Sequence, residues 1–158
     1  MSTVAAPVAE AAEMVAVVEL LGGARVLRHR LRDPLDAHEL LLEGLPGQAL
    51  SHLLGRLVLM RMSGSLERAV GMSLRTFQRR KEAPARLLSP EQSGRTWKFA
   101  EILARATAVF GSQEEAERWL ERPAIGLNQR RPIDLLATPA GLELVETFLQ
   151  RLKYGVYA

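Results

Sequence analysis

The chain has 158 residues, of which 47% are hydrophobic and 25% are charged, and its formal net charge is +3 at pH 7. A chain of this length buries enough surface to fold without disulfides or metals, so we expect one domain or two small domains that share a core. The sequence has no cysteine, which excludes disulfides, thiolate metal sites and thiol catalysis. No uncharged apolar run has membrane-spanning length, and the N-terminus lacks the basic start of a signal peptide. These features predict a cytoplasmic globular protein with no membrane partner.

The N-terminal segment is predicted to contain one helix and one short strand. Met1–Glu13 is expected to be a loose, alanine-rich lead-in to a helix over 12–21, which ends at Gly22-Gly23. Between Arg25 and Arg32, residues alternate in a pattern that is typical of a short strand with one basic face. The remainder of the chain is predicted to be helical.

Capping residues and apolar periodicity predict where the later helices begin. Asp33 is a suitable N-cap before Pro34, which suits the first helical position. Ser89–Gln92 and Ser112–Glu115 each have the residue pattern of a capping box. The acidic run that includes Glu117 is expected to favour the N-terminus of its helix. The predicted helices cover residues 34–42, 48–60, 65–70, 74–82, 90–110, 113–122, 131–136 and 139–152.

A helix-turn-helix unit is predicted in the middle of the chain. Ala69 is small enough for the crossing of the two helices, and Gly71 suits the tight turn between them. Met72, Leu74 and Phe77 can face the core. Serine, threonine and lysine bind phosphates, while glutamine and arginine can also bind base edges, so the outer face is predicted to contact DNA. The residues predicted to make this contact are Ser73, Arg75, Thr76, Gln78, Arg79, Arg80 and Lys81.

Positive charge is concentrated in the same stretch. Residues 71–86 contain five basic side chains and one acidic side chain, a net charge of +4 that exceeds the +3 of the whole chain. Such a concentration of charge attracts the phosphate backbone of DNA. A solvated basic helix after a glycine turn would carry the same charge. The DNA interpretation therefore depends also on the small residue, the turn glycine and the serine cap.

Several segments together form a more specific pattern than any one of them. These segments are Ser73–Lys81, Leu88–Arg95, Val109–Ser112, Ala116, Trp119-Leu120, Pro132–Leu136, Thr138, Gly141 and Leu152–Tyr157. In this order they resemble the motifs of Xre-type antitoxins of the MbcA/ParS/Xre family, including its "LSPEQS.R" segment. The similarity extends from about residue 45 to the last residue of the sequence. Gly94 departs from the family at a position where a polar residue is expected.

The resemblance implies an all-α fold with an Xre-like helix-turn-helix domain and a small helical C-terminal toxin-binding domain. It implies a bacterial type II antitoxin that blocks the active site of a RES-domain toxin, an enzyme that degrades NAD. It also implies repression of the antitoxin's own operon through operator DNA, as a homodimer or in a larger toxin–antitoxin complex. The domains are predicted to be 1–44 (helical or dimerisation segment), 45–110 (DNA binding) and 111–158 (toxin binding).

The C-terminal tail is the predicted toxin-binding element. Large side chains at a chain terminus can anchor in a partner's pocket, or they can pack back on their own core. The residues alone leave both alternatives open, and the family resemblance favours the partner. The tail residues predicted to bind the toxin are Lys153, Tyr154, Gly155, Val156, Tyr157 and Ala158.

No residue pattern predicts catalysis, a metal or a cofactor. His29, His38 and His52 are scattered without the spacing of metal ligands. Trp97 and Phe99 are expected in the core rather than in a base-stacking platform. We therefore expect a protein that is not an enzyme and has no cofactor. Two alternatives to the antitoxin remain: a helix-turn-helix transcription regulator without a toxin partner, and a toxin-binding protein with a degenerate DNA-binding motif.

Overall fold

The computed structural model describes residues 5–60, 63–79 and 86–155. Within these ranges all regular structure is helical, so the predicted all-α fold is confirmed. The elements are α1 (Ala5–Leu20), α2 (Gly23–Leu27), α3 (Pro34–Glu43), α4 (Gly47–Arg56), α5 (Gly64–Val70), α6 (Leu74–Arg79), α7 (Pro90–Phe110), α8 (Gln113–Leu120), the 3-10 turn η1 (Ile125–Leu127), α9 (Pro132–Leu135) and α10 (Pro139–Lys153).

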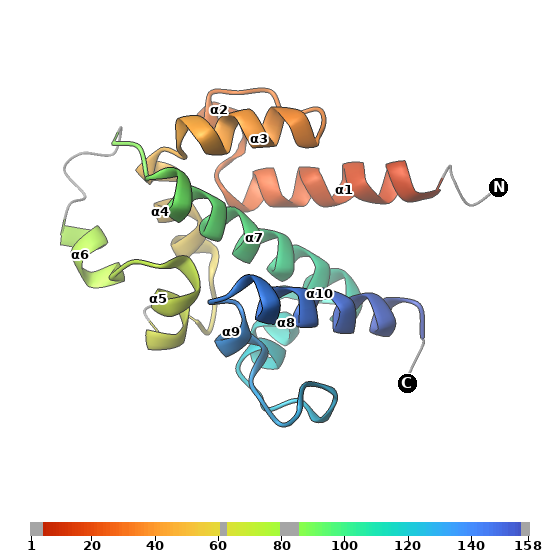
Figure 1. Cartoon of the computed structure of the whole chain (residues 1–158). Coiled ribbons are helices and arrows are strands. Elements are labelled where there is room, and N and C mark those ends of the chain that lie inside the picture. Colours follow the sequence, from red (N-terminus) through yellow and green to blue (C-terminus); the bar gives the residue numbers. More distant parts are fainter. Residues whose placement is uncertain (1–4, 61–62, 80–85, 156–158) are drawn as a thin grey trace.

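Helix α7 lies at the centre of the molecule. Figure 1 shows it crossing between α1 to α3 on one side and α8 to α10 on the other, with α5 and α6 beside its N-terminal half. It contacts α1, α3, α5, α8 and α10. Trp97 and Phe99 are buried as predicted, together with Ile102 and Leu103 on the same helix. Because neighbours surround α7, its apolar residues connect the two halves of the chain into one hydrophobic core.

Several predicted helix starts are confirmed, and their caps are local. The Asp33 side chain accepts a hydrogen bond from the backbone N–H three residues later, at 2.9 Å. Ser89 and Gln92 form a complete capping box at the start of α7, with donor–acceptor distances of 3.1 and 3.3 Å. Thr138 caps α10 in the same way as Asp33 caps α3. Each cap is formed by residues three apart, so the sequence alone is enough to locate it.

At α8, half of the predicted capping box is present. The Ser112 hydroxyl accepts the Glu115 N–H at 3.2 Å. The Glu115 carboxylate pairs with Arg118 at 2.6 Å instead of turning back to the cap. Because Arg118, one turn further along the helix, binds the Glu115 carboxylate, this carboxylate does not accept the backbone N–H of Ser112 as a complete capping box requires.

Two predictions for the N-terminal segment are wrong. The predicted lead-in, Met1–Glu13, is helical from Ala5, in agreement with the high helix propensity of alanine. The predicted strand between 25 and 32 does not form: α2 covers residues 25–27, Arg28 is left-handed with φ 58°, and residues 29–32 belong to no helix or strand. No partner strand lies beside this segment within the described ranges. A helical turn satisfies its backbone groups locally and buries Leu27, whereas a single strand would leave those groups unpaired.

Helix α4 ends at Arg56, before the predicted end at Met60, because a buried carboxylate binds the chain that follows. Glu117 of α8 is fully buried and accepts the backbone N–H groups of residues 58–60 at 2.8 to 3.0 Å. The Gln113 side-chain amide donates a further hydrogen bond at 3.0 Å. The prediction that Glu117 serves the helix N-terminus is therefore replaced by a long-range role. This carboxylate holds the segment that leads into α5.

Candidate functional site

The α5–turn–α6 segment has the geometry that its sequence predicts for a helix-turn-helix. Ala69 is buried at the end of α5, and Gly71 has φ +75°, a left-handed conformation that glycine adopts without strain. A Cβ atom at Gly71 would also overlap the guanidinium of Arg95. Leu74 is fully buried and Phe77 packs against the core, so the inner face of α6 agrees with the prediction. The turn can be this tight only because residue 71 has no side chain.

The start of α6 is fixed by two side chains. The Ser73 hydroxyl accepts the Thr76 N–H at 3.2 Å, as predicted for a helix cap. The Glu67 carboxylate, on α5, accepts the Leu74 N–H at 3.1 Å. A negative charge at a helix N-terminus is favourable because it accepts hydrogen bonds from free N–H groups and is attracted to the positive end of the helix dipole. The bond from Leu74 to Glu67 also orients α6 relative to α5.

Four of the seven residues predicted to bind DNA have exposed side chains. They are Ser73, Arg75, Thr76 and Gln78. Arg79 is the last residue of α6, and its side chain lies outside the described part of the structure. Arg80 and Lys81 lie outside the described residues altogether. The exposed side chains include two hydroxyls, one guanidinium and one amide, which are donors suited to phosphates and to base edges.

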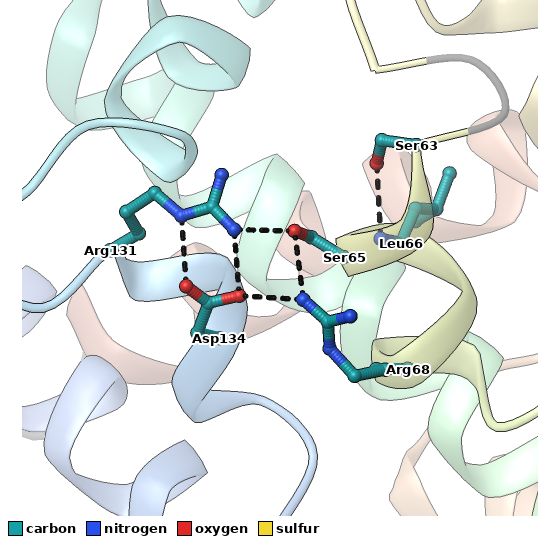
Figure 2. A network of polar contacts seen from close by, with 6 residues as sticks. All are labelled: Ser63, Ser65, Leu66, Arg68, Arg131 and Asp134. Atoms are coloured by element: carbon teal, nitrogen blue, oxygen red, sulfur yellow. Dashed lines mark hydrogen bonds and ion pairs between the residues drawn. The ribbon is translucent and has the colours of Figure 1, made fainter.

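A polar cluster joins the helix-turn-helix to the C-terminal helices. Figure 2 shows Ser65 and Arg68 of α5 facing Arg131 and Asp134 at α9. Two atoms of the Arg131 guanidinium donate to the Asp134 carboxylate at 2.8 and 3.0 Å, and Arg131 also reaches the Ser65 hydroxyl at 2.6 Å. Arg68 approaches the same carboxylate at 3.4 Å. Hydrogen bonds from Arg131 are the main cause that holds the pKa of the Asp134 carboxyl below its ordinary value.

Arg95 of α7 makes a second link between the same regions. Its guanidinium donates to the backbone carbonyl of Arg68 at 2.7 Å and to that of Ala137 at 3.2 Å. It also lies against Gly71 in the turn. Arg95 was identified in the sequence only as part of the family-like segment Leu88–Arg95. Its partners lie 27 and 42 residues away, so no local pattern could reveal them.

The predicted toxin-binding tail follows α10. Lys153 ends the helix, and its ammonium lies 5.7 Å from the centroid of the Tyr154 ring. The Tyr154 side chain is 67% exposed, so it does not pack back on the core. Gly155 has a positive φ of 68° and ends the described part of the chain. Val156, Tyr157 and Ala158 lie outside the described residues.

A groove of about 1000 Å³ runs beside α7, between α1 and α3 on one side and α10 on the other. Trp97 and Arg105 are among its lining residues. Arg105 pairs with Glu13 at 2.6 Å, with Glu101 at 3.4 Å and with Glu146 at 3.6 Å. These ion pairs connect α1 and α10 to α7, so the charged lining holds the helices that form the groove.

No metal-binding cluster of three or more histidine or acidic side chains is present in the part of the chain that the structure describes. Within the same part, no helix is both long and apolar enough to span a membrane.

The fold and the exposed polar face of α6 define a helical protein with a helix-turn-helix domain and a second, C-terminal helical domain. Comparison with known families is consistent with this division. Residues 36–101 match the antitoxin Xre-like helix-turn-helix domain. Residues 105–155 match the antitoxin Xre/MbcA/ParS C-terminal toxin-binding domain. The chain is thus similar to both of these antitoxin domains, each over a separate region.

The chain is also similar to a curated protein. The protein named Antitoxin Xre from Pseudomonas putida (strain KT2440) is 34% identical over 90 residues, which cover 57% of this chain and 56% of the relative. The chain therefore spans little more than half the length of the relative that it matches.

Proposed function

We propose that the protein is a type II antitoxin that neutralises a RES-domain, NAD-degrading toxin and represses its own operon. The observation that carries the proposal is the exposed C-terminal end of the domain that matches toxin-binding domains. Tyr154 is 67% exposed at the end of α10, as a group that inserts into a partner must be. In this proposal the tail, Lys153–Ala158, occludes the toxin's active site. The antitoxin has no catalytic role of its own and acts in the cytoplasm.

The operator-binding part of the proposal depends on the outer face of α6. Ser73 and Thr76 would contact phosphates, while Arg75 and Gln78 are long enough to reach base edges in the major groove. Arg79, Arg80 and Lys81, which follow these residues in the sequence, would add positive charge that attracts phosphates. One recognition helix gives modest affinity, so we propose a homodimer that contacts two half-sites about one helical turn apart. In this model residues 1–44 contribute to dimerisation, 45–110 bind DNA and 111–158 bind the toxin.

A band-shift titration with the upstream promoter at several salt concentrations tests the DNA-binding residues. Arg75→Ala should weaken operator binding, because a contact to a base edge is lost, and the loss of its positive charge should also flatten the salt dependence. Arg151→Ala removes an equally exposed arginine from α10 and serves as the control. Unchanged affinity of the Arg75 variant would exclude its contact with DNA. If the wild-type chain itself does not bind the promoter, the degenerate-motif alternative would be correct.

Deletion of 154–158 tests the toxin-binding part of the proposal. The truncated chain should bind the operator as the wild type does, and it should fail to rescue cells that express the RES-domain toxin of the neighbouring gene. Rescue by the truncated chain would exclude the tail as the neutralising element. Absence of any RES-domain gene beside this one would favour the alternative of a regulator without a toxin partner.

A further inference from the structure

The loop Ala124–Arg130, between α8 and α9, is closed on itself by backbone hydrogen bonds. The Ala124 N–H donates to the Arg130 carbonyl at 3.0 Å, and the Gln129 N–H donates to the Ala124 carbonyl at 2.9 Å. Asn128 and Gln129 both have positive φ, at 56° and 62°, although neither is glycine. Two consecutive residues in this conformation are costly, and they persist only where the surroundings enforce them. The loop is therefore held in one conformation.

The inner side of this loop is fixed to α10 and the core. Leu127 is 7% exposed and belongs to the core, and η1 contacts α10. Gly126 lies so close to Phe148 that a Cβ atom at position 126 would overlap the ring. Phe148 in turn stacks on Trp119, with ring centroids 5.9 Å apart and an angle of 6° between the planes. The stacked rings of Phe148 and Trp119 thus support the inner side of the loop.

The outer side of the loop presents an apolar side chain to solvent. Ile125 is 85% exposed, more than any other large hydrophobic residue in the described ranges. A single exposed apolar residue is common on protein surfaces and has no meaning by itself. Here, however, the residue is held on a fixed loop, so little conformational entropy would be lost on binding. Arg122 and Arg130 lie on either side in sequence, and both are exposed with no ion pair to any described residue.

The position of the loop relative to the end of α10 indicates which partner would bind the loop. Phe148 of α10 lies against Gly126 in the loop, six residues before Tyr154, which directly follows the helix. Six residues correspond to about 9 Å along a helix axis. Figure 1 shows the loop projecting at the bottom of the molecule, below α10. A globular partner that receives the tail would therefore also face the loop. The loop lies inside residues 105–155, which match the toxin-binding domain.

We propose that the Ala124–Arg130 loop is a second contact surface for the toxin, beside the tail. Ile125 enters an apolar pocket on the toxin, and carboxylates at the rim of that pocket pair with Arg122 and Arg130. This proposal rests on the proposed antitoxin function. The tail blocks the active site, whereas the loop provides a preorganised anchor that slows dissociation.

The test compares two full-length variants, Ile125→Asp and Leu35→Asp. Leu35, on α3, is 63% exposed and lies outside both matched domains, so it is the control. The probe is the RES-domain toxin of the neighbouring gene, and its affinity is measured by calorimetry. Loss of a central apolar anchor should weaken toxin binding about 30-fold for Ile125→Asp and less than about 3-fold for Leu35→Asp. Both variants should keep the wild-type melting temperature, and Ile125→Asp should also keep the wild-type operator affinity.

The outcomes separate the loop proposal from the antitoxin proposal. If the wild type binds the toxin and Ile125→Asp binds it equally well, the loop proposal is wrong and the antitoxin proposal stands. If the wild type does not bind the toxin, the antitoxin proposal fails and the loop proposal fails with it. Light scattering, which measures the oligomeric state, tests the other possible partner of the loop, a second copy of this chain. If Ile125→Asp converts a dimer to a monomer without changing toxin affinity, the loop is a self-association surface and our proposal is overturned.

Discussion

Two junctions join the C-terminal helices to the helix-turn-helix region, and each depends on one carboxylate in opposite surroundings. Glu117 is fully buried, and its partners include three backbone N–H groups at residues 58–60. Asp134 has a side chain that is 37% exposed, and its partners are the guanidinium groups of Arg68 and Arg131. A buried carboxylate cannot lose its donors without a large cost, whereas solvent and salt screen an exposed pair. The first junction should therefore determine stability, and the second should determine how α5 is held against α9.

The largest expected effect is that of Glu117→Ala. The substitution removes the acceptor of a buried backbone N–H at Met60 and of partly buried N–H groups at residues 58 and 59, and we expect a loss of about 3–5 kcal/mol in the free energy of unfolding. Urea denaturation followed by circular dichroism measures this loss. Glu114→Ala is the control, because Glu114 is exposed on the same helix and, among the described residues, pairs with Arg118 alone, so it should cost less than about 1 kcal/mol. Equal effects of the two substitutions would contradict the role assigned to the buried junction.

Gly71→Ala is expected to have an intermediate effect, through the separate link that Arg95 makes between the same regions. A Cβ atom there meets the Arg95 guanidinium, and the backbone has φ +75°, so we expect a loss of about 1–3 kcal/mol. Displacement of Arg95 would also break its bonds to α5 and to Ala137, and operator affinity should fall as well. Thermal unfolding and a band-shift assay measure the two consequences.

Gly94→Ala is the matched control for Gly71→Ala. A Cβ atom at Gly94 meets no other atom within 4 Å, and the residue lies inside α7. The substitution should therefore raise stability by about 0.5–1 kcal/mol, since alanine favours a helix over glycine. A stabilised Gly71→Ala variant, or a destabilised Gly94→Ala variant, would reverse this expectation.

The smallest expected effect is that of Asp134→Asn, which should cost less than about 1 kcal/mol at neutral pH and less still in high salt. The pKa of the Asp134 carboxyl is lowered in the folded protein, chiefly by hydrogen bonds from Arg131. Its contribution is therefore present above the unfolded pKa of about 3.9 and is lost as the pH falls through the lower, folded pKa. The difference in melting temperature between wild type and variant should shrink below about pH 4. Glu143→Gln, at an exposed residue of α10 without an ion pair among the described residues, is the control and should leave the melting temperature at neutral pH close to that of the wild type.

Much of the fold could be predicted from the sequence because its signals are short-range. The caps at Asp33, Ser73 and Ser89 each bond a backbone group three residues away, so the helix starts follow from adjacent residues. Gly71 predicted the turn because its missing side chain permits a left-handed backbone. The exposed face of α6 and the buried Leu74 follow from helical periodicity.

The segments that were predicted wrongly depend on partners far away in the chain. The alternation between 25 and 32 is a genuine strand pattern, but no neighbouring strand is available, and a helical turn that buries Leu27 forms instead. The sequence pattern predicts that α4 continues to Met60. In the structure Glu117 instead accepts the backbone N–H groups of residues 58–60, although it lies 57 to 59 residues later in the chain. Local propensity cannot anticipate either outcome, because each is decided by packing.

The sequence by itself therefore determined the helical class, the helix-turn-helix and the polar outer face of α6. Only the tertiary structure decided which side chains hold that unit against the C-terminal helices. Arg95, Glu117 and Asp134 look like ordinary surface charges in the sequence, and their roles arise from distant donors and acceptors. Helix caps act within one turn, whereas these contacts require the chain to fold back on itself, and that difference in range is the physical reason.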